Sequence, residues 1–476
     1  MDPRQKGSGE QTPKPGDLMN RDHQDEPSLG EQVLRRYFRE RPEVVLGAAR
    51  ARELASQSGP LLLKNLVTLT DQEAQALAGH TGDLALDGLA HLSDQAAASL
   101  GRLAGGLSLS GLLEITGPAA CSLGRHRHTL VLDSLQCLTG EAAAGLGRHQ
   151  GTLSLNGLKE LDPGAAWALA GNRGPLFLDG IQCVPEGVAE GLSRHEGILS
   201  MVGVKFLDDA SASHLGSRTG ILILDGLEQL SSGAAEGLAP HRGDLALNGL
   251  RDITDQVAWS LGSAAERFAK PESWLRLNGL VELSSHGAAC LARHRGTLTL
   301  SGIQHLEAPG ISSLGLHRGT LFLNGLLKLS DGAASALGKH QGTLYLSGLG
   351  SISDVAARHL SQVEGSLDLD GLTRLSDQAA DALADHQGGP GRNGILSLKG
   401  LTELSDQSAK SFGRHGCSLA LDGIGSLSDV AAGALAGHTG LLFLTRLSNI
   451  SERAAALLRQ NPNIRFPDPY QSGERG

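Results

Sequence analysis

The sequence predicts an α/β solenoid, a stack of short strand-loop-helix units with a parallel β-stack on one face. The first observation is a repeat, because a marker position, occupied by Gly88 in one of the plainest copies, recurs in 17 copies. The copies are 23 residues apart except for two longer steps, from Gly249 to Gly279 and from Gly371 to Gly400. A fixed period of this size is typical of repeat architectures.

Two further observations come from the alternation of periods inside each unit. Leucines four and two residues before the marker, such as Leu84 and Leu86, have the period-two spacing of a strand with one buried face. After the marker, Ser or Thr stands at the fifth position in 13 copies and Asp follows in nine, which predicts a helix N-cap. Ala at the ninth position and Leu at the twelfth predict a helix of about ten residues. Glycine near position seventeen is expected to end it with positive φ.

A resemblance to a known family follows from these positions. The unit L-x-L-x-G-L-x-x-L-S-D-x-A-A-x-x-L-A-x-H resembles the cysteine-containing class of leucine-rich repeat, in a bacterial-type variant with a 23-residue GL-x-x-LSD-x-AA-x-x-L unit. The resemblance covers about Leu61 to Phe466, with Leu and commonly His at that class's cysteine positions. It implies a right-handed leucine-rich-repeat-like solenoid of about 17 units, and protein binding on the concave strand face.

The repeat also divides the chain into expected segments. Polar composition predicts disorder at the N-terminus, and helical spacing of apolar residues predicts a cap on the first strand. The expected segments are a disordered tail at 1–30, an N-terminal helical cap at 31–59, a solenoid of 17 repeats at 60–466 and a C-terminal tail at 467–476. Residues 461–466 resemble a degenerate eighteenth strand.

Two insertions interrupt the period, near 262–273 and 388–394. The first has a helix-like sequence between Trp259 and Trp274, so it is interpreted either as a wall beside the strand face or as a tolerated surface insertion. The second, GGPGRNG, has no following Lys-Ser/Thr and leads into a strand. It is therefore not a phosphate-binding loop but an excursion of the chain.

Composition and charge exclude several classes of protein. The formal net charge is -10 with a pI near 6.0, which argues against binding nucleic acid or an anionic membrane surface. No apolar run approaches the length of a membrane span, and the N-terminus has no apolar leader. The odd number of cysteines and the lack of a C-x-x-C motif favour a reduced, cytoplasmic location. These cysteines are Cys121, Cys137, Cys183, Cys290 and Cys417.

One outward column of the strand stack is predicted to bind a partner. Three residues before the marker, four of the chain's 14 aromatic residues occupy a single position, where a scaffold needing only solubility would carry small polar residues. The alternative is that aromatic and β-branched residues merely stabilise strands. The candidate binding residues are Trp274, Arg276, Phe322, Tyr345 and Asp368 on neighbouring strands, with Phe177, Ile223 and Phe443 elsewhere in the column.

A second outward column, directly before the marker, is rich in aspartate. No Asp follows another on adjacent strands, which favours a solvated hydrogen-bonding ladder in which Asn, Ser or Lys separates like charges. The other interpretation is an acidic strip for a basic partner or a divalent cation, whose binding would depend on salt. The acidic ladder comprises Asp87, Asp133, Asp179, Asp225, Asp370 and Asp422.

Eleven of the 18 histidines occupy one repeat position, fifteen residues after the marker. A single column without adjacent Cys or carboxylate groups makes a poor metal site, whereas an imidazole can bond the last carbonyls of a helix and favours its negative end. Helix capping is the preferred interpretation. These residues are His80, His126, His149, His195, His241, His294, His317, His340, His386, His415 and His438.

The predicted function is a non-enzymatic scaffold that binds an unknown protein or peptide on its strand face. The alternative is a structural or assembly module whose repeat count sets its length, without one defined ligand. No catalytic residue, metal site or cofactor is predicted, because no nucleophile, paired-carboxylate or HExxH arrangement stands out. Nucleic acid and membrane partners are not expected, and the sequence leaves the oligomeric state open.

Overall fold

The computed structural model describes residues 46–267, 273–389, 391 and 393–467. Leu46–Gly476 forms one compact unit. The expected tail at 1–30, the first part of the expected cap and residues 468–476 lie outside the described residues.

The strands form one parallel sheet in which each strand pairs with the next along the chain. The register advances by one repeat per strand, so that Leu84 pairs with Leu107 and Ala85 with Ser108. The 18 strands of this sheet are β1 (Leu61–Leu62), β2 (Leu84–Ala85), β3 (Leu107–Ser108), β4 (Leu130–Val131), β5 (Leu153–Ser154), β6 (Leu176–Phe177), β7 (Leu199–Ser200), β8 (Leu222–Ile223), β9 (Leu245–Ala246), β10 (Trp274–Arg276), β11 (Thr297–Thr299), β12 (Leu321–Phe322), β13 (Leu344–Tyr345), β14 (Leu367–Asp368), β15 (Ile395–Ser397), β16 (Ser418–Ala420), β17 (Leu442–Phe443) and β18 (Ile464–Arg465).

In the part of the chain that the structure describes, one helix precedes β1 and one helix follows each strand from β1 to β17. Among the described residues these helices are α2 (Ala48–Ala55), α3 (Asp71–Leu77), α4 (Asp94–Leu100), α5 (Gly117–Leu123), α6 (Gly140–Leu146), α7 (Pro163–Leu169), α8 (Glu186–Leu192), α9 (Asp209–Gly216), α10 (Ser232–Leu238), α11 (Asp255–Arg267), α12 (Ser285–Leu291), α13 (Ala308–Leu314), α14 (Asp331–Leu337), α15 (Asp354–Leu360), α16 (Asp377–Ala384), α17 (Asp406–Gly413), α18 (Asp429–Leu435) and α19 (Glu452–Arg459). This arrangement confirms the predicted fold class, an α/β solenoid of leucine-rich-repeat type.

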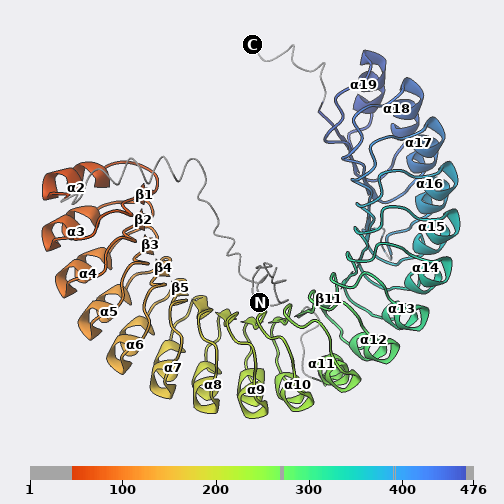
Figure 1. Ribbon diagram of the computed structural model, residues 1–476. Coiled ribbons are helices and arrows are strands. Elements are labelled where there is room, and N and C mark those ends of the chain that lie inside the picture. Colours follow the sequence, from red (N-terminus) through yellow and green to blue (C-terminus); the bar gives the residue numbers. More distant parts are fainter. Residues whose placement is uncertain (1–45, 268–272, 390, 392, 468–476) are drawn as a thin grey trace, which may run out of the picture. The chain divides into compact units, whose positions relative to one another are not determined.

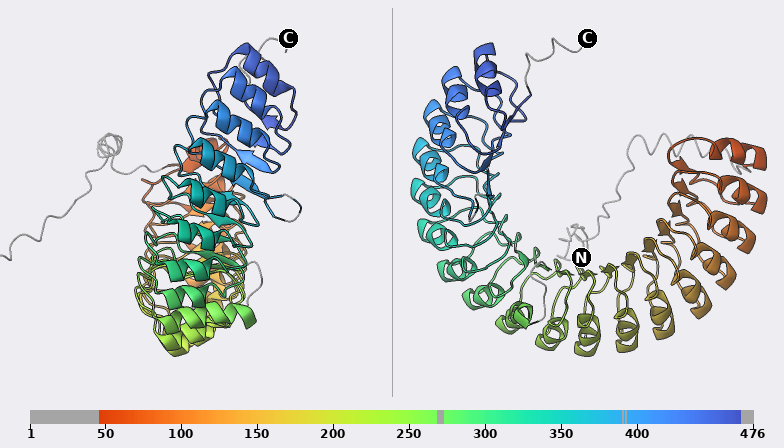
Figure 2. Two further views of the ribbon diagram at one scale, coloured as in Figure 1. Left: turned by 90° about the vertical axis from the view of Figure 1, so that its right-hand side faces the viewer. Right: turned by 180° about the vertical axis from the view of Figure 1, so that it is seen from behind.

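Within the compact unit the two layers lie on opposite sides of a curved stack. Figure 1 shows the strands on the inner side and the helices on the outer side. The view from behind in Figure 2 shows the same single row of helices outside the strands. The inner face is therefore a continuous sheet surface, on which equivalent side chains of successive repeats lie beside one another.

The hydrophobic core lies between these layers and repeats with the sequence. In one copy the strand residues Leu84 and Leu86, together with Leu89 after the marker, are at most 1 % exposed. They meet Ala97 and Leu100 of α4, which are completely buried. Alanine on the helix allows it to approach the strands closely, and the core is therefore thin and continuous from one repeat to the next.

Most helices have seven residues and are shorter than the ten predicted. The chain leaves the helix at the twelfth position through an i to i+3 hydrogen bond, as when the His149 N–H donates to the Leu146 carbonyl over 2.9 Å. This tight turn directs the side chain at position fifteen into the interior, where His149 is completely buried. The helix ends at position twelve because the side chain at position fifteen must enter the core.

The predicted N-caps also join successive repeats. Ser231 accepts a hydrogen bond from the Ala234 N–H over 2.9 Å, which caps α10. Its hydroxyl donates in turn to the Asp209 carboxylate of the preceding repeat over 2.6 Å. The same Ser/Thr-to-Asp bond recurs along the stack, for example from Ser451 to Asp429. The Ser-Asp pair therefore caps one helix and ties it to its neighbour.

Most glycines near position seventeen are required by close approach and not by positive φ, which corrects the expectation for them; Gly388 is the exception with positive φ. A Cβ added to Gly319 would lie 2.0 Å from the Gly296 carbonyl oxygen of the preceding repeat, and one on Gly342 would lie 2.0 Å from the Gly319 oxygen. Among the described glycines, positive φ occurs only at Gly47, Gly59 and the insertion residues Gly388, Gly389 and Gly391. Stacked backbones leave no room for a side chain.

Replacing Gly319 by Ala is expected to destabilise the fold by about 1–3 kcal/mol, because a backbone carbonyl cannot move aside without separating two repeats. Gly332 in α14 is the matched control, since a Cβ there meets nothing within 4 Å. Gly332→Ala should be neutral or stabilising by up to about 1 kcal/mol. Urea denaturation followed by circular dichroism compares the two variants. Equal midpoints would contradict the close-approach explanation.

The insertions are partly described. The first extends α11 to Arg267, which makes it a helix of 13 residues, and residues 268–272 lie outside the described residues. In the second, Gly388 and Gly394 are joined by a backbone hydrogen bond of 3.1 Å, and residues 390 and 392 lie outside. Over the described ranges, no helix is long and apolar enough to cross a membrane.

Candidate binding surface

The strand face brings five of the predicted binding residues together. Register pairs Arg276 with Thr299, Thr299 with Phe322, Phe322 with Tyr345, and Tyr345 with Asp368, so that column runs without a gap from β10 to β14. We call Trp274, Arg276, Phe322, Tyr345 and Asp368 the aromatic patch.

Three rings make up the centre of the aromatic patch. Phe322 and Tyr345 stack with centroids 4.0 Å apart and planes only 4° apart. Trp274 meets Phe322 at 6.0 Å with a tilt of 31°. Trp274 is 36 % exposed, whereas Phe322 and Tyr345 are half-buried. Preorganised, partly exposed rings offer apolar area that a partner can bury at low entropic cost.

Charged groups of opposite sign stand at the two ends of these rings. The Arg276 guanidinium lies over the Trp274 ring, 4.8 Å from its centroid. At the other end, Asp368 accepts a hydrogen bond of 2.9 Å from Ser347 Oγ and another of 2.9 Å from the Asp370 N–H. Burial raises the pKa of the Asp368 carboxyl. The aromatic patch therefore presents a cation, three rings and a carboxyl group in sequence.

The other three predicted binding residues lie apart from this patch. Phe177 pairs with Ser154 and Ser200, and Ile223 with Ser200 and Ala246, so small residues flank both. Phe443 on β17 has Ala420 and Arg465 beside it. All three side chains are half-buried on the strand face. Since none of the three has an aromatic or β-branched side chain paired with it, these residues form no shared surface.

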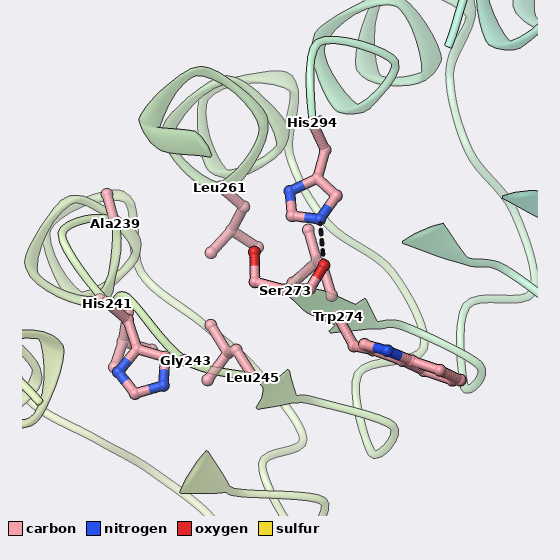
Figure 3. A pocket seen from close by; sticks show the side chains of 10 residues that line it. Ala239, His241, Gly243, Leu245, Leu261, Ser273, Trp274 and His294 are labelled. Carbon is pink, nitrogen blue, oxygen red and sulfur yellow. Dashed lines mark hydrogen bonds between the residues drawn. The ribbon is translucent and has the colours of Figure 1, made fainter. Parts of the chain in front are cut away.

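A small cavity lies where the first insertion interrupts the repeat. Its volume is about 30 Å³, and it is lined by residues of three successive repeats, including His241, Leu261 and His294. Figure 3 shows the indole of Trp274 extending away from the other lining side chains, while His294 Nε2 bonds the Ser273 carbonyl oxygen over 3.2 Å. A volume of this size holds about one water molecule. The cavity is therefore too small for a ligand larger than water.

In each carboxylate of the acidic ladder, one oxygen atom accepts hydrogen bonds from groups within the fold. Asp133 Oδ1 accepts from Ser154 Oγ at 2.6 Å and from the Asn156 N–H at 3.0 Å on the next strand. Asn156 Oδ1 then accepts from the Asp179 N–H at 2.9 Å. Asp87, Asp179, Asp225, Asp370 and Asp422 also accept the N–H of the next strand.

This arrangement gives the acidic ladder a structural role. Asn and Asp alternate as acceptors of otherwise unpaired N–H groups at the ends of the strands, where a single oxygen atom suffices. Asp370 also faces Lys399, whose Nζ lies 3.7 Å from Oδ2. Of the acidic ladder, only Asp370 lies beside the aromatic patch.

The repeated histidines are interior groups. All eleven are at most 5 % exposed, and each follows a helix. Neighbouring rings stack, with the His317 and His340 centroids 5.9 Å apart. His438 Nδ1 bonds the Phe412 carbonyl over 3.1 Å, and His415 Nδ1 bonds the Ala384 carbonyl over 3.0 Å. Both carbonyls belong to the preceding repeat, whereas the sequence interpretation placed the bond in the residue's own helix.

Burial also determines the charge of these imidazoles. It lowers the pKa of His126, His241, His294, His340 and His386 to about 4. They are therefore neutral at pH 7, and the expected attraction between a charged imidazole and a helix dipole does not operate. Within the described part of the chain, no three His, Cys, Asp or Glu side chains converge as metal ligands.

The sequence interpretation missed two features of the surface. Thr299 stands between Arg276 and Phe322, and its short, buried side chain lets the Trp274 ring reach Phe322 across β11. On the helix side, Arg194 covers the Trp167 ring at 3.9 Å and Arg293 covers the Trp259 ring at 4.6 Å. The available signal was an arginine directly before the repeated histidine.

No protein-family model matches this chain, and no curated protein matches it either. Solved structures similar to it include a leucine-rich repeat protein of Leptospira interrogans, at 17 % identity over 89 % of this chain and 98 % of that chain, with a TM-score of 0.44. A chain of the Drosophila Toll–Spätzle complex has 15 % identity over 86 % of this chain and 54 % of its own length, with a TM-score of 0.46. An internalin of Listeria monocytogenes has 12 % identity over 92 % of this chain and 93 % of that chain, with a TM-score of 0.29. These likenesses are too weak to place any functional residue.

Proposed function

We propose that this protein is a non-enzymatic scaffold that binds a protein or peptide on its strand face, with the aromatic patch as the principal contact. The observation that carries the proposal is the stack of Phe322 on Tyr345, extended by Trp274 and bordered by Arg276 and Asp368. Aromatic and Arg side chains dominate the binding energy of protein interfaces.

The order of groups supports a particular kind of partner. An apolar or aromatic side chain would lie on the rings, an acidic group beside Arg276 and a basic group beside Asp368. We therefore propose a peptide segment with separated charges around an apolar centre.

Replacing Trp274, Phe322 and Tyr345 together by Ser is expected to weaken binding of such a segment at least about tenfold, because three hot-spot rings are lost. Peptides are first selected against the intact protein from a displayed random library. Their affinity for the triple variant is then measured by fluorescence anisotropy. The matched control replaces Phe177, Ile223 and Phe443 by Ser, which removes three isolated side chains of the same face.

Unchanged affinity for the triple variant would overturn the proposed contact. The alternative, an assembly module without one defined ligand, predicts a different result. In that case no peptide is enriched, and sedimentation shows an oligomer that the triple variant cannot form. Circular dichroism of both variants separates loss of binding from loss of folding.

A further inference from the structure

We propose that the edge of the solenoid where helices α4 to α8 end binds an extended acidic peptide. Six arginines lie in the loops that lead from these helices to the next strands, directly before or after repeat position fifteen. We call them the basic edge: Arg102, Arg125, Arg127, Arg148, Arg173 and Arg194. This proposal is independent of the aromatic patch.

The side chains of the basic edge are available to a ligand. All six residues are exposed. In the described part of the chain none of them forms an ion pair, although Arg194 lies over Trp167. The neighbouring row on the helix side carries Ala98, Cys121, Ala144, Trp167 and Glu190, and Glu196 follows position fifteen in the last of these repeats, so six cations face two carboxylates along this edge. A concentration of positive charge thus persists in a protein whose formal net charge is -10.

The helix dipole alone does not explain these arginines. Basic residues near a helix C-terminus are favourable in every repeat, yet later copies have Gln362 and Glu364, or Asp385 and Gln387, at the same two positions. The acidic residue after the N-cap persists in those later repeats, as at Asp429. Arg127 and Arg173 also follow position fifteen and so lie beyond the helix end. Basic residues also occupy these positions in later repeats, at Arg242, Arg293, Arg295, Arg318, Lys339 and Arg414, but α4 to α8 are the only five consecutive repeats that each supply one. This unbroken row favours an extended ligand.

The spacing between successive repeats along the basic edge fits an extended polypeptide. The rings of His126 and His149, which lie between the arginines of neighbouring loops, have centroids 6.0 Å apart. An extended chain advances about 3.3 Å per residue, so every second side chain repeats at about 6.6 Å. Acidic residues at alternate positions of the peptide would each face one repeat. The Arg side chains are long enough to bridge the small difference between the two spacings.

An open hollow provides a seat for one of these acidic side chains. Its volume is about 440 Å³, and Arg148 and Arg173 line it together with the short side chains of Ala144 and Ala168. Two guanidinium groups from neighbouring loops can therefore approach the same carboxylate, which favours charge-assisted bonds.

Single-stranded nucleic acid fits this edge less well than an acidic peptide. Such strands are held by aromatic faces on which bases stack, in addition to positive charge. Trp167 is the aromatic residue beside the basic edge, and the Arg194 guanidinium already lies 3.9 Å above its ring. The proposed class of ligand is therefore an acidic peptide.

The test measures fluorescence anisotropy of a labelled peptide in which Glu alternates with Ser. Replacing Arg125, Arg148 and Arg173 together by Gln is expected to weaken its binding at least about tenfold at low salt. The matched control replaces Arg251, Lys328 and Arg374 by Gln, because these exposed cations lie in the loops that precede the helices. It changes the net charge equally and should alter affinity less than about twofold.

Three results would overturn the proposal. Equal losses in the two triple variants would show that only net charge matters. Tighter binding of a single-stranded DNA of equal charge would assign the edge to nucleic acid. Salt-sensitive self-association that disappears with Arg125, Arg148 and Arg173 would assign it to a second copy. The Ser variants of the aromatic patch should retain peptide binding, which separates this site from the proposed function.

Discussion

Lowering the pH from 6.5 to 4 is expected to destabilise this protein strongly. Burial lowers the pKa of His126, His241, His294, His340 and His386 to about 4, whereas an exposed imidazole in the unfolded chain titrates near 6.5. Between these values the unfolded chain binds protons that the folded chain does not. Stability is therefore complete above about pH 6.5 and falls with pH until about pH 4.

The expected loss of stability is large because a buried histidine occupies the same repeat position in several copies. A lowering from 6.5 to about 4 corresponds to about 3 kcal/mol for each imidazole. Five such groups together are comparable with the about 5–15 kcal/mol that stabilises an ordinary domain. The melting temperature, followed by circular dichroism from pH 7.5 to pH 4, should fall steeply across this window. A melting temperature that stays constant would contradict the interpretation.

Asparagine offers a control that the chain itself supplies. Asn172 occupies the histidine position in one repeat, where Nδ2 donates to the His149 carbonyl over 3.0 Å. Replacing His126, His340 and His386 by Asn should therefore preserve the fold and reduce the loss of stability on acidification. Replacing the exposed His91 by Asn should leave the pH profile unchanged.

Replacing Arg218 by Ala is expected to cost about 4 kcal/mol. Arg218 occupies the histidine position of its repeat and is 1 % exposed. Its Nη2 donates to the His195 and Gly197 carbonyls, each over 2.8 Å, and its Nε donates to His195 over 3.0 Å. Alanine would leave these carbonyls unpaired and would open a cavity between two repeats.

The charge of Arg218 opposes this loss without reversing it. Burial lowers the pKa of the guanidinium to about 10, so it remains charged at pH 7 and its desolvation is a cost that substitution removes. Arg218→His should therefore cost about 1 kcal/mol or less, because the imidazole fits this position in eleven other repeats. Urea denaturation of both variants measures the difference. The exposed Arg242 is the control, and equal effects of Arg218→Ala and Arg242→Ala would refute a structural role for Arg218.

Local patterns were sufficient to predict the elements of the fold. Strands alternate Leu84 and Leu86 toward the core, and Ser93 begins a helix by accepting the Ala96 N–H over 3.0 Å. These interactions involve residues at most a few positions apart, so periodicity and capping rules describe them. The predicted helix was too long because the turn after Leu100 depends on the side chain at position fifteen, which must enter the interior.

The candidate sites required contacts between repeats that no single unit contains. The sequence placed Phe322 and Tyr345 in one outward column and favoured them because they lie on neighbouring strands, with Phe177 and Phe443 elsewhere in the column. The structure places the ring of Trp274, which comes from a different column, against Phe322 across the short side chain of Thr299. Side-chain reach across a strand decided which of these residues meet.

By itself the sequence determined the repeat, the order of strand and helix, and the columns of equivalent side chains, because these follow from spacing along one chain. Only contacts in the tertiary structure explain why particular residues occupy those columns. Gly319 is needed because the Gly296 carbonyl lies where its Cβ would be. Five of the repeated histidines are neutral because burial in the stack lowers their pKa to about 4. Both reasons arise between neighbouring repeats, where backbones 23 residues apart come into contact and exclude water.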